Sequence, residues 1–461
     1  MTIVYGSINN KNGLITDDER DLLQENKPGY GTRSKTEGAF SLVNSTVGSG
    51  IIGLPFAIYL AGFWTAIVLS IMVAAISQLG LYMLVLSGQR SGTYKLATLM
   101  EHVIGRPGYH FLNFLVLIQA AGACVSYYIL LGDTIPVLLQ LYFPDHPNLT
   151  QRSLTAYVNY LKKVLPLNLS RSLGALSKWS ILSVLCLPVI IIALIWRAPT
   201  YAKSHDAPLN WQSPDIFGAL GILAFAFACP HVCFSVYLSL KQQAIESWKM
   251  TTTLASIITW IISISFAAIG YLSFGVDVQP NLFLNFPPDD LVVNVARFAL
   301  GFSMILTIPM AFHPTREAIQ KLLGFETAER QPNKIEHYVV TLMLFIIITT
   351  LGITIRSLGK VYALIGGFAA TCLAYILPSI AYLITRRQPY STIPIIDNDL
   401  SDDEITNIKV PWMIHQDSSS STSSSITLDP IPKFGLLDVA AIFTLLWGVI
   451  VMIFATSGAL K

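Results

Sequence analysis

The stretch NSTVGSGIIGLPF, residues 44–56, places three glycines and a proline inside an otherwise apolar run. Within a helix, glycine costs about 1 kcal/mol relative to alanine, and proline about 3 kcal/mol. A helix that breaks here would leave the peptide N–H groups of Ser49, Gly50 and Ile51 at the start of its second half. Free N–H donors and the positive end of the helix dipole both favour an anion. The stretch therefore predicts a carboxylate-binding site.

A second break is predicted in ILAFAFACPHVCF, residues 222–234, where Pro230 and His231 stand at the centre of an apolar run. Phe225, Cys229 and small residues around it would line a pocket. Because Asp and Glu occur only towards the ends of the apolar segments, this pocket has no obvious counter-charge for a charged side chain. A carboxylate site beside an apolar pocket predicts a neutral amino acid as the ligand.

His231 has two interpretations. Histidine titrates near physiological pH and could couple the protein to protons, or it could stay neutral and hydrogen-bond a carbonyl that the break frees. Cys229 and Cys233 are four residues apart, but Pro230 disturbs that helix face and no further ligand is near, so no metal is expected. The odd number of cysteines, all in apolar segments, indicates packing and not disulfides. Arg297, deep in an apolar segment, indicates a snorkelling or pore-lining cation.

Membrane-spanning helices must position these residues. Of the 461 residues, 53% are hydrophobic and 12% are charged, and soluble domains carry about twice that charged share. The first 36 residues are polar, so no cleaved signal peptide is expected. The net charge of +2 does not favour nucleic acid as a partner. Crossing the bilayer takes about 20 apolar residues, and ten blocks are suitable: 38–60, 63–86, 109–141, 179–196, 216–238, 250–274, 291–313, 338–355, 361–384 and 434–456.

The segment 142–178 decides the topology. If residues 154–173 cross the membrane, most basic loop residues lie on the side of the N-terminus, which agrees with the positive-inside rule. If they do not cross, the basic residues divide almost evenly. We therefore expect eleven spans, with a cytoplasmic N-terminus and with Lys461 outside or in a lumen. The fourth span is unusual, because Lys162 and Lys163 stand in its middle.

Composition also divides the chain. We expect a disordered cytoplasmic tail (1–36), a core of spans 1 to 10 (37–385), a disordered serine-rich cytoplasmic loop (386–433), and span 11 with a short end (434–461). Spans 1 to 5 and 6 to 10 form natural halves, and each predicted break falls in the first span of its half. Transporters built from inverted repeats use broken helices in this way. Close helix packing is the alternative explanation for the glycines.

Several motifs resemble one known family. LVNSTVGSGIIGLPFAIYLAGF, VSYYILLGD, LPLNLSRSLGALSKWS, FAFACPHVCFSVYLSL and ILTIPMAFHPTREAI are similar to the amino acid/auxin permease family of the APC superfamily. The sodium-coupled neutral amino acid transporters and the fungal vacuolar amino acid transporters are the most similar branches. The resemblance covers about residues 36 to 385. It implies an all-α membrane protein of the LeuT type, with a five-plus-five inverted repeat, discontinuous spans 1 and 6, and ion-coupled amino acid transport.

The resemblance also implies an ion site. Asn44 matches the span-1 asparagine that helps to bind sodium in the sodium-coupled branch. Thr307 is the best match for the span-8 threonine of that site, and Ser303 lies one turn earlier on the same face. The family's unwound, substrate-contacting loop matches Gly48, Ser49 and Gly50. Two features depart from the family: relatives often have Cys-His in span 6 where this chain has Cys-Pro-His, and span 4 is more polar than theirs.

The residues together predict a secondary active transporter of neutral L-amino acids that works by alternating access. No enzyme activity, ATP-binding loop or organic cofactor is indicated. As the coupling ion, the residues favour Na⁺ over H⁺, because hydroxyl and amide oxygens are available and a deep carboxylate is not. The proton-coupled vacuolar relatives keep the alternative open. A membrane amino-acid sensor that signals through its cytoplasmic tails is the alternative function, and a channel is a weaker one.

The predicted partners are an amino acid substrate and the lipid bilayer. In the N-terminal tail, DDERDLL places Asp18 four residues before the pair Leu22 and Leu23. This spacing resembles an acidic dileucine signal for sorting adaptors, which direct proteins to vacuolar or lysosomal membranes. The plasma membrane is the alternative location.

Overall fold

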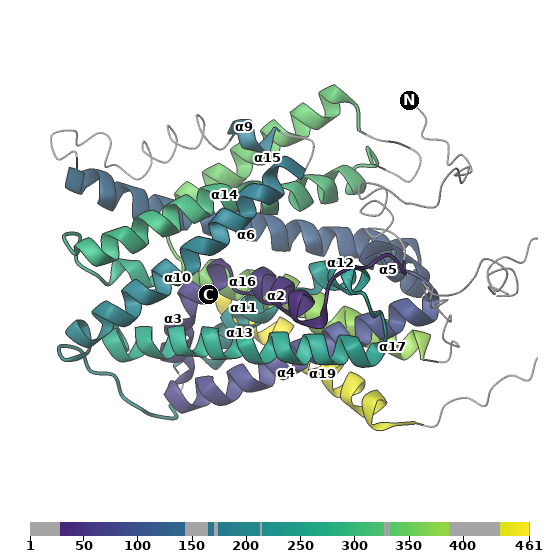
Figure 1. Cartoon of the computed structure of the whole chain (residues 1–461), viewed down its shortest axis with the longest axis horizontal. Coiled ribbons are helices and arrows are strands. Elements are labelled where there is room, and N and C mark those ends of the chain that lie inside the picture. The colour runs from purple at the N-terminus through teal and green to yellow at the C-terminus, as the bar shows by residue number, and fades with distance from the viewer. Residues whose placement is uncertain are drawn as a thin grey trace, which may run out of the picture.

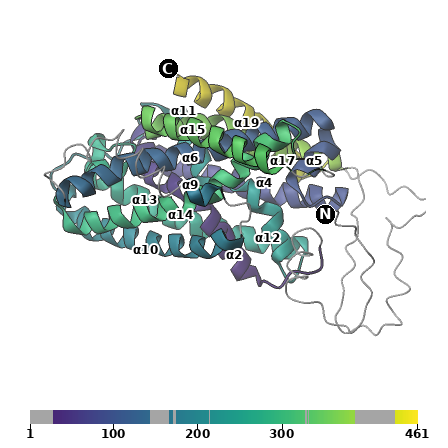
Figure 2. The same ribbon diagram turned by 90° about the horizontal axis from the view of Figure 1, so that it is seen from above.

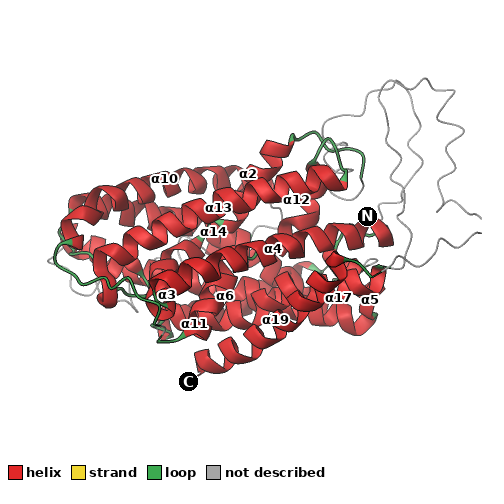
Figure 3. Cartoon of the chain, turned by 90° about the horizontal axis from the view of Figure 1, so that it is seen from below, coloured by secondary structure: helices red, strands yellow, loops and turns green. Residues whose placement is uncertain are grey.

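The protein is almost entirely helical. Its long helices lie side by side along one direction (Figures 1 and 3). The only β-type pairing in the described part of the chain is one isolated bridge between Arg33 and Leu240. The predicted all-α class is therefore confirmed. The computed structural model describes residues 28–142, 165–169, 174–212, 214–326, 330, 332–386 and 434–460.

The helices follow the predicted apolar blocks. In chain order the spans are α2 (Lys35–Thr46) with η1 (Ser49–Gly53) and α3 (Leu54–Ala61), α4 (Phe63–Ser91), α6 (Arg106–Tyr142), α10 (Gly174–Ala202), α11 (Ile216–Phe227) with η3 (Pro230–Val232) and α12 (Cys233–Ser239), α13 (Ile245–Phe274), α14 (Leu291–Leu322), α15 (Lys334–Thr354), α16 (Leu358–Ile365) with η6 (Gly366–Ala370), η7 (Cys372–Ile376) and α17 (Leu377–Thr385), and α19 (Leu436–Leu460). Shorter elements between them are α5 (Leu96–Ile104), α9 (Leu165–Asn168), η4 (Gly275–Asp277) and η5 (Leu282–Leu284).

The spans that the sequence predicted are present where the chain is described. Nine helices there are long and apolar enough to cross a membrane, and α2 with α3, which are bent by 57° at their break, make a tenth. The predicted fourth span, residues 154–173, lies mostly outside the described residues, and only α9 and the residue after it fall within them. The eleventh crossing therefore stays a prediction. The predicted serine-rich loop, the dileucine segment and most of the N-terminal tail also lie outside the described residues.

Polar caps set where several spans begin. Before α2, the Glu37 amide donates to Ser34 Oγ at 3.3 Å, and the Ser34 amide donates to Glu37 Oε2 at 2.7 Å. Asn333 and Glu336 make the same reciprocal cap before α15. At α14, Asp290 accepts from two amides of the first turn. Such caps satisfy N–H groups that a helix start otherwise leaves without partners.

The bundle has two distinct ends. The start of α2, α5, and the ends of α12 and α17 lie together on the right of Figures 1 and 2, and we call this the α5 end. The segments 203–215 and 275–290 connect helices at the opposite end, which we call the loop end. The helices α6 and α10 run from the α5 end to the loop end, whereas α14 runs back between them and packs against both.

Residues 28–34, which the sequence analysis placed in the tail, dock on the linker between α12 and α13 at the α5 end. The Arg33 amide donates to Ser239 O at 2.8 Å, and the Lys241 amide donates to Arg33 O at 2.8 Å. A Cβ atom on Gly31 would lie 2.1 Å from Leu240 O, so the two backbones approach as closely as glycine alone allows. This docking ties the start of span 1 to the end of span 6.

Candidate transport site

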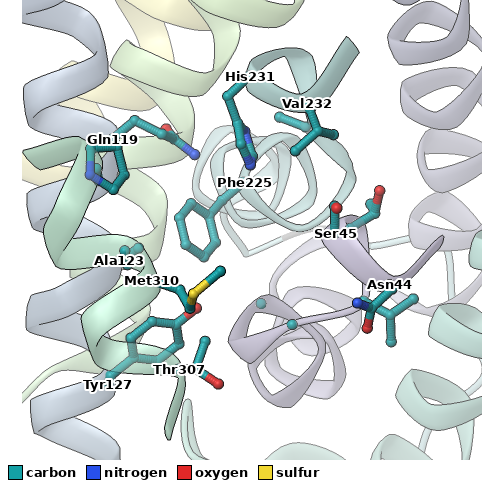
Figure 4. Close-up of a pocket in the computed structure, with 18 of the residues that line it drawn as sticks. Asn44, Ser45, Gln119, Ala123, Tyr127, Phe225, His231, Val232, Thr307 and Met310 are labelled. Carbon is teal, nitrogen blue, oxygen red and sulfur yellow. The ribbon is translucent and has the colours of Figure 1, made fainter. Parts of the chain in front are cut away.

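A cavity of about 380 Å³ lies between the two broken spans and the helices α6, α10 and α14 (Figure 4). Its wall includes Asn44, Gly48 and Gly50 from span 1 and Phe225 and His231 from span 6. Both predicted breaks therefore contribute to one cavity. Its wall also contains α14 residues from Ser303 to Pro314 and α6 residues from Val116 to Tyr127, with Ser183 and Leu187 from α10 and Ala370 and Leu373 from span 10.

The break in span 1 lies at the predicted glycines. The helix α2 ends at Thr46, and η1 begins at Ser49 after Gly48 has left helical geometry (φ −122°, ψ −145°). The Ile51 amide is bonded to Gly48 O at 3.3 Å, and the Ile51 side chain is 3% exposed in the core. The N–H groups of Ser49 and Gly50 are the first two of η1, where the helix itself supplies no acceptor. Ile51 therefore does not line the cavity, unlike its glycine neighbours.

Spans 1 and 6 cross next to this break. A Cβ atom on Gly50 would lie 3.0 Å from the Ala226 Cα and 3.3 Å from a ring carbon of Phe225. The Phe225 ring in turn stacks on Tyr362, with centroids 4.9 Å apart. Gly50 therefore fits both explanations of the glycines, close helix packing and a binding site. It permits the close crossing of spans 1 and 6, and it also exposes backbone to the cavity.

The break in span 6 lies at the predicted proline. The helix α11 ends at Phe227, Ala228 is extended, and η3 begins at Pro230. The His231 side chain is exposed to the cavity, whereas Cys229 is 5% exposed and packed in the core. The structure therefore brings His231 and Phe225 to the cavity wall, and it does not bring Cys229 there.

Three hydroxyl groups meet on the wall between α10 and α14. Ser183 Oγ lies 2.8 Å from Ser303 Oγ and 2.7 Å from Thr307 Oγ1. Thr307 Oγ1 also donates to Ser303 O at 2.8 Å. Asn44 lies on the opposite side of the cavity from Thr307 (Figure 4). The structure thus groups two of the three predicted ion-binding residues with a serine that the sequence analysis did not identify.

The helix α6 contributes one face to the cavity wall. Gln119, Ala123 and Tyr127 follow at four-residue intervals on one face and all line the cavity (Figure 4). Tyr128 turns away and packs its ring against Phe345 at 6.4 Å. A polar glutamine in the middle of an apolar span was the available signal for this face.

The cavity lies towards the α5 end of the bundle. Most wall residues of α6 and both wall residues of α10 lie in the half that starts at the α5 end, and most wall residues of α14 lie in the half that finishes there. The exposed polar side chains of the wall are Asn44 on α2 and His231 on η3. Both elements belong to the α5 side of their spans. A solute could therefore enter from the α5 end.

Arg297 closes the loop end. Its guanidinium is 2% exposed and donates to the carbonyl oxygens of Phe283, Phe286 and Pro287 at 2.7–3.1 Å, and to Asn294 Oδ1 at 2.7 Å. The interpretation of Arg297 as a snorkelling or pore-lining cation is therefore wrong, because its partners are the carbonyls of a folded loop and it does not line the cavity.

An ion pair between α10 and the start of α14 also stabilises the loop end. Asp290 Oδ2 accepts from Arg197 Nε at 2.6 Å and from the Tyr201 hydroxyl at 2.8 Å. Burial would raise the pKa of Asp290, but the hydrogen bonds from Tyr201 and Arg197 outweigh burial and hold that pKa below its ordinary value. Asn281 Nδ2 also donates to Asp133 Oδ2, in the second half of α6, at 3.1 Å. The loop end is therefore tied to α6, α10 and α14 together.

The chain is similar to known membrane transport proteins. A family model described as transmembrane amino acid transporter protein matches residues 31–394. A bovine protein named putative sodium-coupled neutral amino acid transporter 11 is 32% identical over 379 residues, which are 81% of each chain. Vacuolar amino acid transporter 2 of Saccharomyces cerevisiae is 28% identical over 386 residues, covering 79% of this chain and 78% of its own. Among solved structures, a manganese transporter of Eremococcus coleocola is similar over 99% of both chains, with 12% identity and a TM-score of 0.46.

Proposed function

Because this chain belongs to the transmembrane amino acid transporter family, we propose that it carries neutral amino acids across its membrane by ion-coupled alternating access. The observation that carries the proposal is that the breaks of both discontinuous spans line the same cavity. Its volume of about 380 Å³ is in the range of small-molecule sites. A helix break at membrane depth is tolerated where it lines such a cavity.

The substrate carboxylate is proposed to bind at the Ser49 and Gly50 amides. These N–H groups begin η1, and the positive end of that half-span favours an anion. Phe225 would cover the apolar part of the substrate. None of the residues that form the cavity wall in the described structure is Asp, Glu, Lys or Arg. Because a charged side chain would have no opposite charge there, the cavity suits a neutral one.

The coupling ion is proposed to be Na⁺, bound at the hydroxyl groups of Ser183, Ser303 and Thr307. Oxygen atoms of hydroxyl and carbonyl groups are the ligands that hard cations prefer. Asn44 lies across the cavity on α2. We infer that α2 moves towards α14 when the cavity closes at the α5 end, and that Asn44 then joins the ion site. The rival coupling group is His231, which would carry a proton.

The state described here is proposed to be inward-facing, since the exposed polar side chains of the cavity wall, Asn44 and His231, lie towards the α5 end and the N-terminus is expected to be cytoplasmic. Single cysteines in a version without other cysteines test this orientation. One in the loop 276–289 should react with an impermeant reagent from the outer or lumenal face only, and one near Ser419 from the cytoplasmic face only. Labelling of both from one face contradicts the orientation.

Uptake by proteoliposomes tests the function. Radiolabelled neutral amino acids are supplied with a sodium gradient, and then with choline in place of sodium at fixed pH. We expect uptake to require sodium, and we expect Ser183→Ala to raise the sodium concentration for half-maximal uptake about tenfold, the equivalent of one lost ligand interaction. Ser273→Ala is the matched control, because it removes an equally buried hydroxyl from α13, away from the cavity.

The same assay decides between the two ions. If uptake ignores sodium, follows the pH gradient and is uncoupled by His231→Gln, the sodium proposal is wrong and the proton alternative is correct. If the protein binds amino acids but gives no net uptake under either gradient, the transport proposal itself fails.

A further inference from the structure

Gln119 is a polar residue of the cavity wall with a buried acceptor that has no partner. Its Oε1 atom is buried and has no hydrogen-bond partner, and it is the only such buried atom among the described side chains that line the cavity. An enclosed acceptor without a partner is unfavourable. Two other glutamines of the bundle are bonded: Gln78 Nε2 donates to Thr253 Oγ1, and Gln89 Nε2 donates to the Tyr237 hydroxyl at 2.6 Å. Gln320 Nε2 on α14 is also buried without a partner, but it does not line the cavity. The amide of Gln119 is therefore available to something that the protein itself does not supply.

The position of Gln119 on the cavity wall allows it to contact a bound solute. In the view of Figure 4, Gln119 and His231 lie towards one edge of the cavity, while Thr307 lies towards another edge. Phe225, Ala123 and Met310 present apolar surface between these polar groups. A substrate held by its carboxylate at the span-1 break would therefore direct its side chain over an apolar surface towards a polar rim.

We propose that Gln119 is a specificity-determining residue for the transport activity proposed above, on which this inference rests. Its carboxamide pairs with the side chain of the substrate and favours amino acids whose side chain ends in a carboxamide, an imidazole or a hydroxyl over aliphatic ones of the same size. An amide offers both an acceptor and two donors and can turn about its last bond, so it can pair with a second carboxamide in both directions at once.

Hydrogen bonding is expected to discriminate between substrates more strongly than size does. An apolar pocket discriminates weakly between side chains of equal size. A polar group that already stands unpaired in the cavity gains a partner from one substrate and stays unpaired with the other, which separates the two more strongly. Glutamine and methionine have nearly the same length and shape, so the ratio of their transport measures this single hydrogen-bonding difference.

The test compares kcat/KM for glutamine and methionine in proteoliposomes of the full-length protein. Wild type is expected to prefer glutamine, and Gln119→Met, which keeps the size of the side chain and removes the amide, should lower the glutamine-to-methionine ratio at least tenfold. Gln78→Met is the matched control, because it removes a glutamine amide that bonds between α4 and α13, away from the cavity. Its ratio should stay that of wild type.

A second variant keeps the test possible if Gln119→Met does not reach the membrane. Gln119→Asn keeps the carboxamide and retracts it by one methylene group, so it should also lower the ratio, by about threefold or more. A ratio within twofold of wild type in either recovered variant overturns the assignment of Gln119. Uptake of neither amino acid by the wild-type protein overturns the proposed function instead, and this inference with it.

Discussion

Arg297 offers the sharpest test of how the loop end is held closed. Its buried guanidinium bridges the start of α14 and the carbonyl oxygens of Phe283, Phe286 and Pro287. Replacing it with methionine keeps the length and apolar character of the side-chain stem but removes every donor. The three carbonyls would then lose the donors that the side chain at position 297 supplies.

The magnitude follows from these contacts. A buried acceptor that loses its partner costs about 1–3 kcal/mol, and three carbonyls are affected. Water that enters the loop can donate to some of these carbonyls. We therefore expect Arg297→Met to reduce the free energy of unfolding by about 3–5 kcal/mol, in the lower half of the range summed over the three carbonyls. For a protein of this size such a loss lowers the melting temperature by about 3–5 °C.

The assay is the melting temperature of the detergent-solubilised protein, with uptake measured in parallel. Arg297→Lys keeps the charge but concentrates its donors on one nitrogen, so it should recover only part of the loss. Arg356→Met is the control, because Arg356 is exposed between α15 and α16. If Arg297→Met melts within about 2 °C of wild type, the bridge to the loop carbonyls does not stabilise the closed end and the reasoning is wrong.

Three further predictions concern packing and charge. Gly366→Ala places a Cβ atom 1.8 Å from Gly221 O, so it should separate spans 6 and 10 and abolish uptake; normal uptake would contradict this close crossing. Gly31→Val collides with Leu240 O at 2.1 Å and should release residues 28–34, which limited proteolysis would detect as faster cleavage before α2, whereas an unchanged cleavage pattern would argue against the docking. Asp290 has a lowered pKa, so its contribution to stability is present at neutral pH and is lost on acidification through the folded-state pKa; Asp290→Asn should therefore lower the melting temperature at pH 7 and weaken its fall between about pH 5 and pH 3. An identical acid profile in the variant would refute that assignment.

The sequence by itself determined where the chain crosses the membrane and where it breaks. Apolar blocks of sufficient length and the placement of Gly48, Gly50 and Pro230 are local properties, because the bilayer supplies no partner for an unpaired backbone group. The caps before α2 and α15 are local as well, because the two partners of each cap lie within four residues of each other in the sequence. These features are therefore readable in the printed sequence.

Only the tertiary structure decided which side chains share the cavity. Ser183 meets Ser303 although 120 residues separate them, and no periodicity along the chain specifies how α10 is rotated against α14. Rotation also explains why Gln119 reaches the cavity while Ile51 and Cys229 face the core, although the latter two lie beside the breaks. For Arg297, the sequence revealed a buried charge but not its partners. Those partners are carbonyls of a loop, and their positions depend on how that loop folds over α14, which the packing of the whole bundle determines.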